Sequence, residues 1–341
     1  MLVPLLLGLV VAATTGELVP RIAMPIPQAI GSYAADVAWE NADAVLIATG
    51  KGIQRFSLRT QASEQLVKPA PLPDGLPDAL VVASDGEALI AVSPLALGGY
   101  AMRLSDRKRL SAMRLNLLPL HAPVRGKQAC LLAFPMMQKT DEAVWCGTVD
   151  KSWLKYEPVH RLTAGQAAFR HAFYFARAGA VALADDDSLY VVTSVEPGVF
   201  HYAPDGKLIE ILGQSFDELV RPATPELGTR FATDVDGRYR LLLNTQPTIE
   251  DLVLTPRGPG IVVRIAEKER TRWELWWPRA DGRLVPPTRL GIDRIGPFGH
   301  IQCDARGSSL ACVGSKPSAK QAADFHVSES SPHLWIFELP K

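Results

Sequence analysis

The stretch DVAWENADAVLIATG, Asp36–Gly50, decides the fold that this chain is expected to adopt. It places two short apolar runs on either side of a polar turn, ENAD, which is the pattern of two antiparallel strands joined by a tight hairpin. The same phrase returns as DALVVASDGEALIAVS from Asp78, AVALADDDSLYVVTS from Ala180, DLVLTPRGPGIVVRIA from Asp251 and HIQCDARGSSLACVG from His300. A strand pair that recurs every roughly 40 to 55 residues indicates a repeat architecture built from small sheets.

The repeated phrase predicts an all-β fold, a six-bladed β-propeller in which each blade is a four-stranded meander and the phrase supplies its two inner strands. The third blade is the least regular, and QACLLAF with EAVWCGT is taken as its inner pair. The long interval before the fifth blade contains FATDVDGRYRLLLNTQ, so seven blades are the alternative. The six predicted blades begin near Asp36, Asp78, Gln128, Gly179, Asp251 and His300.

The two ends of the chain complement each other. The segment LVPRIAMPIP, residues 18–27, has the form of an outer strand without inner strands before it, while the terminal HLWIFELP is a third strand that lacks a fourth. We expect the N-terminal strand to join the C-terminal blade and close the ring, which removes an exposed sheet edge. Residues 17–341 then form a single propeller domain, with insertions near 213–250 and 316–332.

Composition narrows the classes of partner. A chain of 341 residues with 47% apolar content can bury a large core, and its 36 basic residues balance 36 acidic ones. Without a net positive field, nucleic acid is not an expected partner. The first sixteen residues, MLVPLLLGLVVAATTG, have the apolar run and small residues of a signal peptide, and the run is too short to span a membrane. A periplasmic or secreted protein without a membrane span is therefore predicted.

The four cysteines fall into two local pairs. Cys130 and Cys146 flank one predicted strand turn, and Cys303 and Cys312 flank another. An even number of cysteines behind a signal peptide, without CxxC spacing, favours two disulfides across hairpins over a zinc site. Four buried thiols are the alternative.

Candidate binding residues come from aligning the blades on their inner turns. Three aspartates share one position at the start of the channel-lining strand, and a glutamine and a histidine fall near it; they are Asp36, Asp78, Asp251, Gln128 and His300. Oxygen ligands converging on a channel mouth suit calcium or another divalent cation, with the three aspartates as the metal ligands. The competing interpretation is structural, because an aspartate at a strand start often accepts hydrogen bonds from backbone amides.

Aromatic residues offer a further hypothesis. The tryptophans of RWELWWP, residues 272–278, occupy both faces of a predicted strand and are interpreted as packing between blades, whose two faces are both buried. A carbohydrate-binding or carbohydrate-cleaving propeller that uses Trp39, Trp145 or Trp153 near the surface is the alternative.

The phrases TDVDGRYRLLLN and ADDDSLYVVT resemble the D-x-D-G-x-x-apolar core of NHL-repeat and gluconolactonase-like six-bladed propellers. The resemblance to NHL-repeat propellers implies a binding or scaffolding module for a protein or small-molecule partner, without chemistry of its own, and this is the function we expect. The resemblance to gluconolactonase-like propellers implies the alternative, a metal-dependent lactonase-like hydrolase with a cation in the central channel. In that case Asn244 would correspond to the asparagine that this family places around the cation. The family's opening E-G-P pattern is not found in this sequence.

Overall fold

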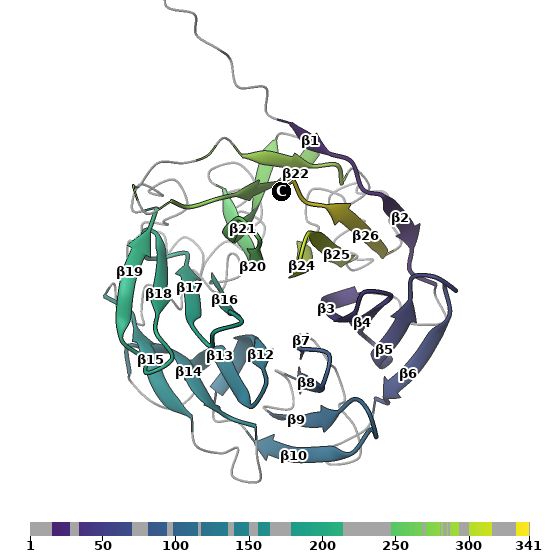
Figure 1. Ribbon diagram of the computed structural model, residues 1–341, viewed down its shortest axis with the longest axis horizontal. Coiled ribbons are helices and arrows are strands. Elements are labelled where there is room, and N and C mark those ends of the chain that lie inside the picture. The colour runs from purple at the N-terminus through teal and green to yellow at the C-terminus, as the bar shows by residue number, and fades with distance from the viewer. Residues whose placement is uncertain are drawn as a thin grey trace, which may run out of the picture.

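The computed structural model describes residues 16–27, 34–69, 81–93, 98–114, 117–135, 140–149, 156–163, 179–213, 247–267, 270–279, 281, 285, 287–292, 300–315 and 332–340. These ranges contain no helix and form six small sheets in a ring (Figure 1). The predicted all-β, six-bladed propeller is therefore confirmed. No helix in the described ranges is long and apolar enough to cross a membrane.

Each blade runs from an inner strand at the channel to an outer strand at the rim. Blades one and two are β3 (Ala34–Asn41), β4 (Ala44–Thr49), β5 (Gly52–Ser57), β6 (Ser63–Val67) and β7 (Val81–Ser84), β8 (Ala88–Ser93), β9 (Gly98–Arg103), β10 (Arg109–Arg114). Blades three and four are β11 (Leu117–His121), β12 (Val124–Arg125), β13 (Gln128–Pro135), β14 (Glu142–Thr148), β15 (Glu157–Arg161) and β16 (Gly179–Leu183), β17 (Leu189–Thr193), β18 (Val199–Tyr202), β19 (Leu208–Leu212). Blades five and six are β20 (Thr248–Thr255), β21 (Gly258–Glu267), β22 (Arg270–Trp276), β23 (Thr288–Leu290), β1 (Glu17–Leu18) and β24 (His300–Arg306), β25 (Ser309–Ser315), β26 (His333–Glu338), β2 (Ile22–Pro25).

In blade three the predicted inner pair is wrong by one strand. The channel-lining strand is β11 with β12, both of which pair with β13, so QACLLAF and EAVWCGT form the second and third strands. The true inner strand, LLPLHAPVR, contains Pro119 and Pro123, and the ladder shifts register beside Pro119. Because proline lacks the amide that a regular strand donates, a segment with two prolines does not have the sequence pattern of an inner strand.

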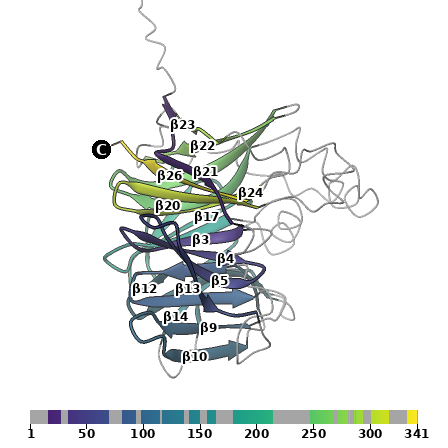
Figure 2. The same cartoon turned by 90° about the vertical axis from the view of Figure 1, so that its right-hand side faces the viewer.

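The predicted ring closure is confirmed. Strand β2 pairs antiparallel with β26, with Ala23 opposite Trp335, and completes the last blade. The preceding strand β1 pairs in parallel with β23, so the N-terminal segment crosses from blade five to blade six. In the edge-on view of Figure 2 the purple N-terminal segment runs alongside β23 and β26. One short segment thus covers the outer edges of two blades.

The core consists of apolar layers between adjacent blades. The tryptophans of β22 and the residue after it alternate between two such layers, as a strand period of two requires. Trp273 and Trp277 pack against blade six, and Trp276 packs against blade four. Their interpretation as packing between blades is confirmed. Trp39 and Trp145 are also buried, so neither offers an exposed platform.

Both predicted disulfides are present. Cys130 lies directly opposite Cys146 on β13 and β14, and Cys303 lies opposite Cys312 on β24 and β25. The Cα atoms of each pair are 4.1 Å apart. The predicted signal peptide up to residue 15, Asp78, Trp153 and the two insertions, for the most part, lie outside the described residues.

Candidate functional site

The two described carboxylates of the predicted set have the structural role. Asp36 on β3 and Asp251 on β20 are both buried, and each accepts two backbone amides: one from the next residue and one from the inner strand of the next blade. The amides are Val37 N (2.9 Å) and Val82 N (3.0 Å) for Asp36, and Leu252 N (2.8 Å) and Cys303 N (2.8 Å) for Asp251. The innermost strand of a blade has no further strand to pair with, so these carboxylates supply acceptors that its channel-side amides need.

Other side chains make the same kind of bridge between neighbouring blades, one of them at the junction of blades five and six that Asp251 also spans. Each contact joins an acceptor on one blade to an inner-strand amide of the next blade. These contacts are Glu250 with Ile301 N (3.3 Å), Asp304 with Trp39 N (2.7 Å) and His121 with Val181 N (3.5 Å). Around the channel, neighbouring blades are therefore joined by hydrogen bonds between side chains and backbone amides that lie far apart in the sequence.

His121 joins three blades. Its Nδ1 accepts from Val181 of blade four, and its Nε2 lies 3.0 Å from Oδ1 of Asp251 in blade five. An imidazole that accepts at Nδ1 carries its proton on Nε2, so it donates to the Asp251 carboxylate in the neutral form. Sequence reasoning missed His121 because it lies on the proline-interrupted strand of blade three.

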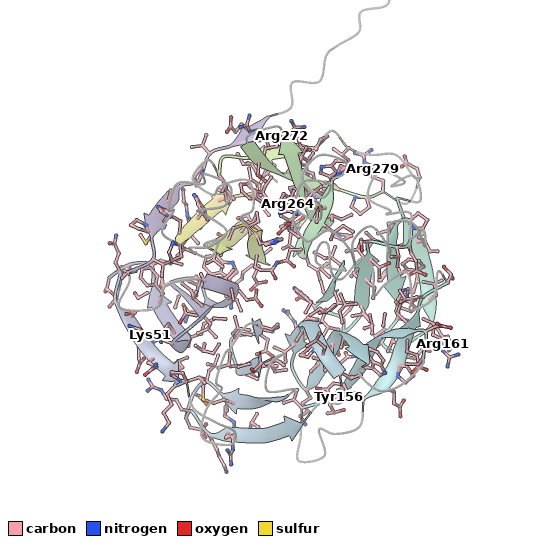
Figure 3. All side chains as sticks on the ribbon, turned by 180° about the vertical axis from the view of Figure 1, so that it is seen from behind. Lys51, Tyr156, Arg161, Arg264, Arg272 and Arg279 are labelled. Atoms are coloured by element: carbon pink, nitrogen blue, oxygen red, sulfur yellow. A yellow bond between two sulfur atoms is a disulfide. The ribbon has the colours of Figure 1, made fainter. Side chains whose placement is uncertain are left out.

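The other predicted residues do not converge. Gln128 lies on β13, the second strand of its blade, opposite Arg125. His300 begins β24, and its Nδ1 lies 3.1 Å from Oε2 of the buried Glu250. Arg264 also approaches Glu250, with Nε 3.2 Å from Oε1. Figure 3, which views the ring from behind, shows Arg264 near the centre of the ring and Arg161 at its outer edge. Among the described residues, no group of three or more His, Cys, Asp or Glu side chains is placed to share a metal ion.

A cavity of about 850 Å³ occupies the axis of the ring, and all six blades line it. It opens where the turns between first and second strands meet, an end that we call the hairpin mouth. Its lining includes five carboxylates and two guanidinium groups, namely Asp36, Asp85, Asp185, Asp186 and Asp304 with Arg125 and Arg306. The described lining is therefore acidic, although the whole chain is neutral.

The pKa of Asp304, one of these carboxylates, is strongly raised. It lies in the channel wall on β24, and burial raises its pKa to about 7, opposed by the hydrogen bond from Trp39 N and reinforced by the charges of Asp251 and Asp36. The indole Nε1 of Trp39 also donates to the backbone carbonyl of Asp304, at 3.0 Å. A lone acid inside an apolar inner strand, as in IQCDA, is the sequence signal that could have revealed it.

Polar contacts between neighbouring turns fix part of the hairpin mouth. Oδ2 of Asp85 accepts Gly126 N of blade three at 2.6 Å, and Arg125 forms an ion pair with Asp185 of blade four. The charge of Asp185 is thereby compensated within the protein, although its side chain is exposed.

Blades six, one and two meet in a close contact at the same mouth. Arg306 donates to the carbonyl of Glu40 at 2.8 Å. Gly86, with φ of +92°, lies beneath them, and a Cβ at this position would come within 2.6 Å of the Glu40 carbonyl oxygen. Only glycine suits this backbone conformation and this approach.

Blades three and four share a buried polar network that the sequence did not reveal. His160 contacts Glu196 through Nε2 (2.8 Å) and Tyr202 through Nδ1 (2.6 Å), and Glu196 also accepts the amide and hydroxyl of Thr163. Burial works to raise the pKa of Glu196, but His160 and Thr163 outweigh it and hold the pKa below its usual value. The network lies between apolar side chains and is structural.

No family model matches the chain, and no curated protein matches it. Among solved structures, a member of the duf4221 family from Bacteroides vulgatus aligns with a TM-score of 0.55 and 9% identity, over 94% of this chain and 97% of that one. The RRP9 WD40 repeats align at 0.54 and 11%, over 94% and 99%. A gluconolactonase from Xanthomonas campestris aligns at 0.49 and 13%, over 93% and 89%. At such identities the likeness shows the fold alone, and the chain is a six-bladed β-propeller.

Proposed function

We propose that this propeller is a binding module that takes a positively charged ligand, either a small molecule or a charged group of a partner protein, at the hairpin mouth of its channel. The observation that carries the proposal is the cavity of about 850 Å³, whose five lining carboxylates outnumber its two guanidinium groups. A concave site with walls of low dielectric concentrates such a field, which raises the local concentration of cations.

The carboxylates of the lining are not equivalent. Both oxygens of Asp36 accept backbone amides, and Asp185 pairs with Arg125. Asp304 accepts the Trp39 amide through Oδ2 and is also hydrogen-bonded by the backbone of Ala305, but burial raises its pKa to about 7 and its charge has no cationic partner in the cavity lining. A cation in the channel would supply that partner. Asp304 is therefore the residue on which we expect binding to depend.

Pentalysine, with pentaglutamate as the matched control, provides the test. Calorimetric titration should show saturable binding of pentalysine, no binding of pentaglutamate, and weakening as salt rises, because the attraction is electrostatic. Asp304→Asn keeps the acceptor for Trp39 N and removes the charge, so it should weaken pentalysine binding at least tenfold above pH 7. Equal affinity for both peptides, or none for either, would contradict the proposal.

The described contacts do not favour the metal-dependent hydrolase as a second candidate function. Its cation would require the carboxylates of Asp36 and Asp251, and these already accept two amides each. Thermal unfolding in calcium, magnesium, manganese or zinc, each against a chelator, tests this choice. A saturable rise in melting temperature that Asp251→Asn abolishes would restore the enzyme alternative by linkage.

For localisation, we propose the periplasm or the exterior of the cell. Two disulfides support an oxidising compartment, and the apolar first sixteen residues support export. Expression of the full chain followed by N-terminal sequencing tests this: export predicts a mature protein that begins near residue 17 and contains no free thiol. A cytoplasmic protein with an intact N-terminus would contradict it.

A further inference from the structure

The axial cavity has a side branch between blades four and five. In four blades the cavity touches only the inner strand and its turn, but in blades four and five it extends to the second strand. We call this branch the side cleft. Its walls are Asp186, Ser188 and Tyr190 of blade four and Pro256, Gly258 and Pro259 of blade five.

Small residues leave this space open. Ala182 and Ala184 line the cavity on the side of blade four. Gly258 faces them from blade five with φ of +104°, and nothing lies within 4 Å of the position that its Cβ would occupy. Tyr190 and Leu254, at this end of the layer between the two blades, are only partly buried. The cleft is thus a gap in the packing between blades that opens into the channel.

One wall of the cleft is a braced aromatic ring. Tyr190 stacks on His201, with ring centroids 4.1 Å apart and an interplanar angle of 9°. Nδ1 of His201 lies 3.2 Å from Oε1 of Glu210, which fixes the orientation of the imidazole. The facing wall is Pro256 and Pro259, so an apolar chain entering the cleft would lie between an aromatic ring and two prolines.

The cleft contains one carboxylate, that of Asp186, and the imidazole of His201, which contacts Glu210, acts on it electrostatically. Asp186 accepts Ser188 N at 3.1 Å, and the side chain and amide of Ser188 hold the pKa of Asp186 below its usual value, so it is ionised at neutral pH. The neighbouring Asp185 is paired with Arg125. Arg257 follows the cleft wall in sequence but lies over Trp277, 5.2 Å from its ring centroid, on the face of blade five that packs against blade six. The Arg257 guanidinium therefore lies on the side of blade five away from the cleft.

From this arrangement we infer that the side cleft binds an alkylammonium group, with the apolar stem against Tyr190 and the prolines and the ammonium at Asp186. An ammonium close to an aromatic face and a carboxylate is stabilised by both. The ligand is a free amine or the lysine side chain of a partner protein, two sources of the same chemistry. This inference rests on the proposed function, because it names the group that the channel mouth selects.

The experiment compares linear amines with matched variants. Methylamine, propylamine and pentylamine are titrated against the protein by calorimetry, and affinity should rise about fourfold per methylene if the stem is buried. Asp186→Asn and Tyr190→Ala should each weaken pentylamine binding at least tenfold. Tyr190→Phe keeps the ring and should stay within twofold of the unaltered protein. Asp187→Asn is the charge-matched control: Asp187 does not line the cavity, and its φ of 63° is one that asparagine tolerates.

The outcomes separate the cleft from the channel. Affinity that is independent of chain length, or that survives both Asp186→Asn and Tyr190→Ala in variants with unchanged melting temperature, would overturn the inference. If pentalysine still binds these variants and is lost only with Asp304→Asn, the proposed function stands without the cleft. If no cationic probe binds, both fail. A further probe is a pentapeptide that contains one lysine and has an acetylated N-terminus and an amidated C-terminus. If this peptide binds more tightly than pentylamine, the cleft takes the lysine of a partner protein; if pentylamine binds more tightly, the cleft takes a free amine.

Discussion

Replacing Asp304 by asparagine should stabilise the protein at high pH and make its stability less dependent on pH. Its pKa is about 7 in the folded protein and about 3.8 without its environment. A carboxyl with a raised folded-state pKa favours the fold when protonated, so its contribution is greatest below the unfolded value and is lost as pH rises to about 7. At about 1.4 kcal/mol per pKa unit, the loss between pH 5 and pH 8 would be at most about 3 kcal/mol, and partial exposure of the side chain reduces this to about 2 kcal/mol.

The assay is urea unfolding of both proteins at pH 5 and pH 8. Asparagine can accept the Trp39 amide but cannot accept the Ala305 amide through its NH2 group. That loss is the same at both pH values, so the change of the difference with pH isolates the charge. The difference in unfolding free energy between variant and parent should be larger at pH 8 than at pH 5 by about 2 kcal/mol, and other titrating groups cancel because they occur in both proteins. The same difference at both pH values, or a variant that is less stable than the parent at pH 8, would refute the reasoning.

Four further outcomes follow from the contacts. Glu196→Ala should cost about 3 to 5 kcal/mol by urea unfolding, because it leaves a buried network broken, whereas Glu210→Ala, whose side chain is 41% exposed, should cost less than about 1 kcal/mol; equal losses would contradict the burial argument. Asp251→Ala leaves two buried amides without an acceptor and should cost about 2 to 4 kcal/mol, unchanged by calcium or by chelator; a loss seen only with calcium would favour a metal site. Replacing Cys303 and Cys312 together by alanine should cost about 3 kcal/mol of unfolding free energy, given their separation of 9 residues. A dithiol reductant should lower the melting temperature of the parent protein, but it should not change the melting temperature of a variant in which all four cysteines are replaced. Binding of pentalysine at pH 7 should release up to about half a proton as Asp304 ionises, which calorimetry in buffers of different ionisation enthalpy measures; Asp304→Asn should release none from this site.

The fold was predictable because hairpins are local. Five inner pairs carry their turn between two apolar runs, so short-range patterning was enough to place them, and the leftover strands at the two ends implied the closure. The inner strand of blade three was predicted wrongly, also for a local reason. Its inner strand is divided by Pro119 and Pro123, and its turn at Gly126 follows a segment without the alternation of a regular strand.

The site was only partly predictable, because its contacts join different blades. Alignment of the repeats correctly found Asp36 and Asp251 as equivalent, yet the amides that give them their role lie 46 and 52 residues further on. Tyr190 and Gly258 illustrate the same limit. Tyr190 lies within β17 and Gly258 begins β21, and only the stacking of the two sheets reveals a gap between them.

The channel carboxylates differ in their surroundings, and this difference indicates the charge of the ligand. A propeller needs acceptors for the amides on the inner edges of its blades, and Asp36 and Asp251 show how a buried carboxylate meets that need with both oxygens. Asp304 is also hydrogen-bonded by two backbone groups, those of Trp39 and Ala305, yet its charge lies near those of Asp36 and Asp251 and burial raises its pKa to about 7. Above this pKa the charge therefore opposes folding, and a destabilising ionisable group in a cavity is typical of a binding site. A cationic ligand would remove that cost on binding, so the energy stored at Asp304 becomes part of the affinity.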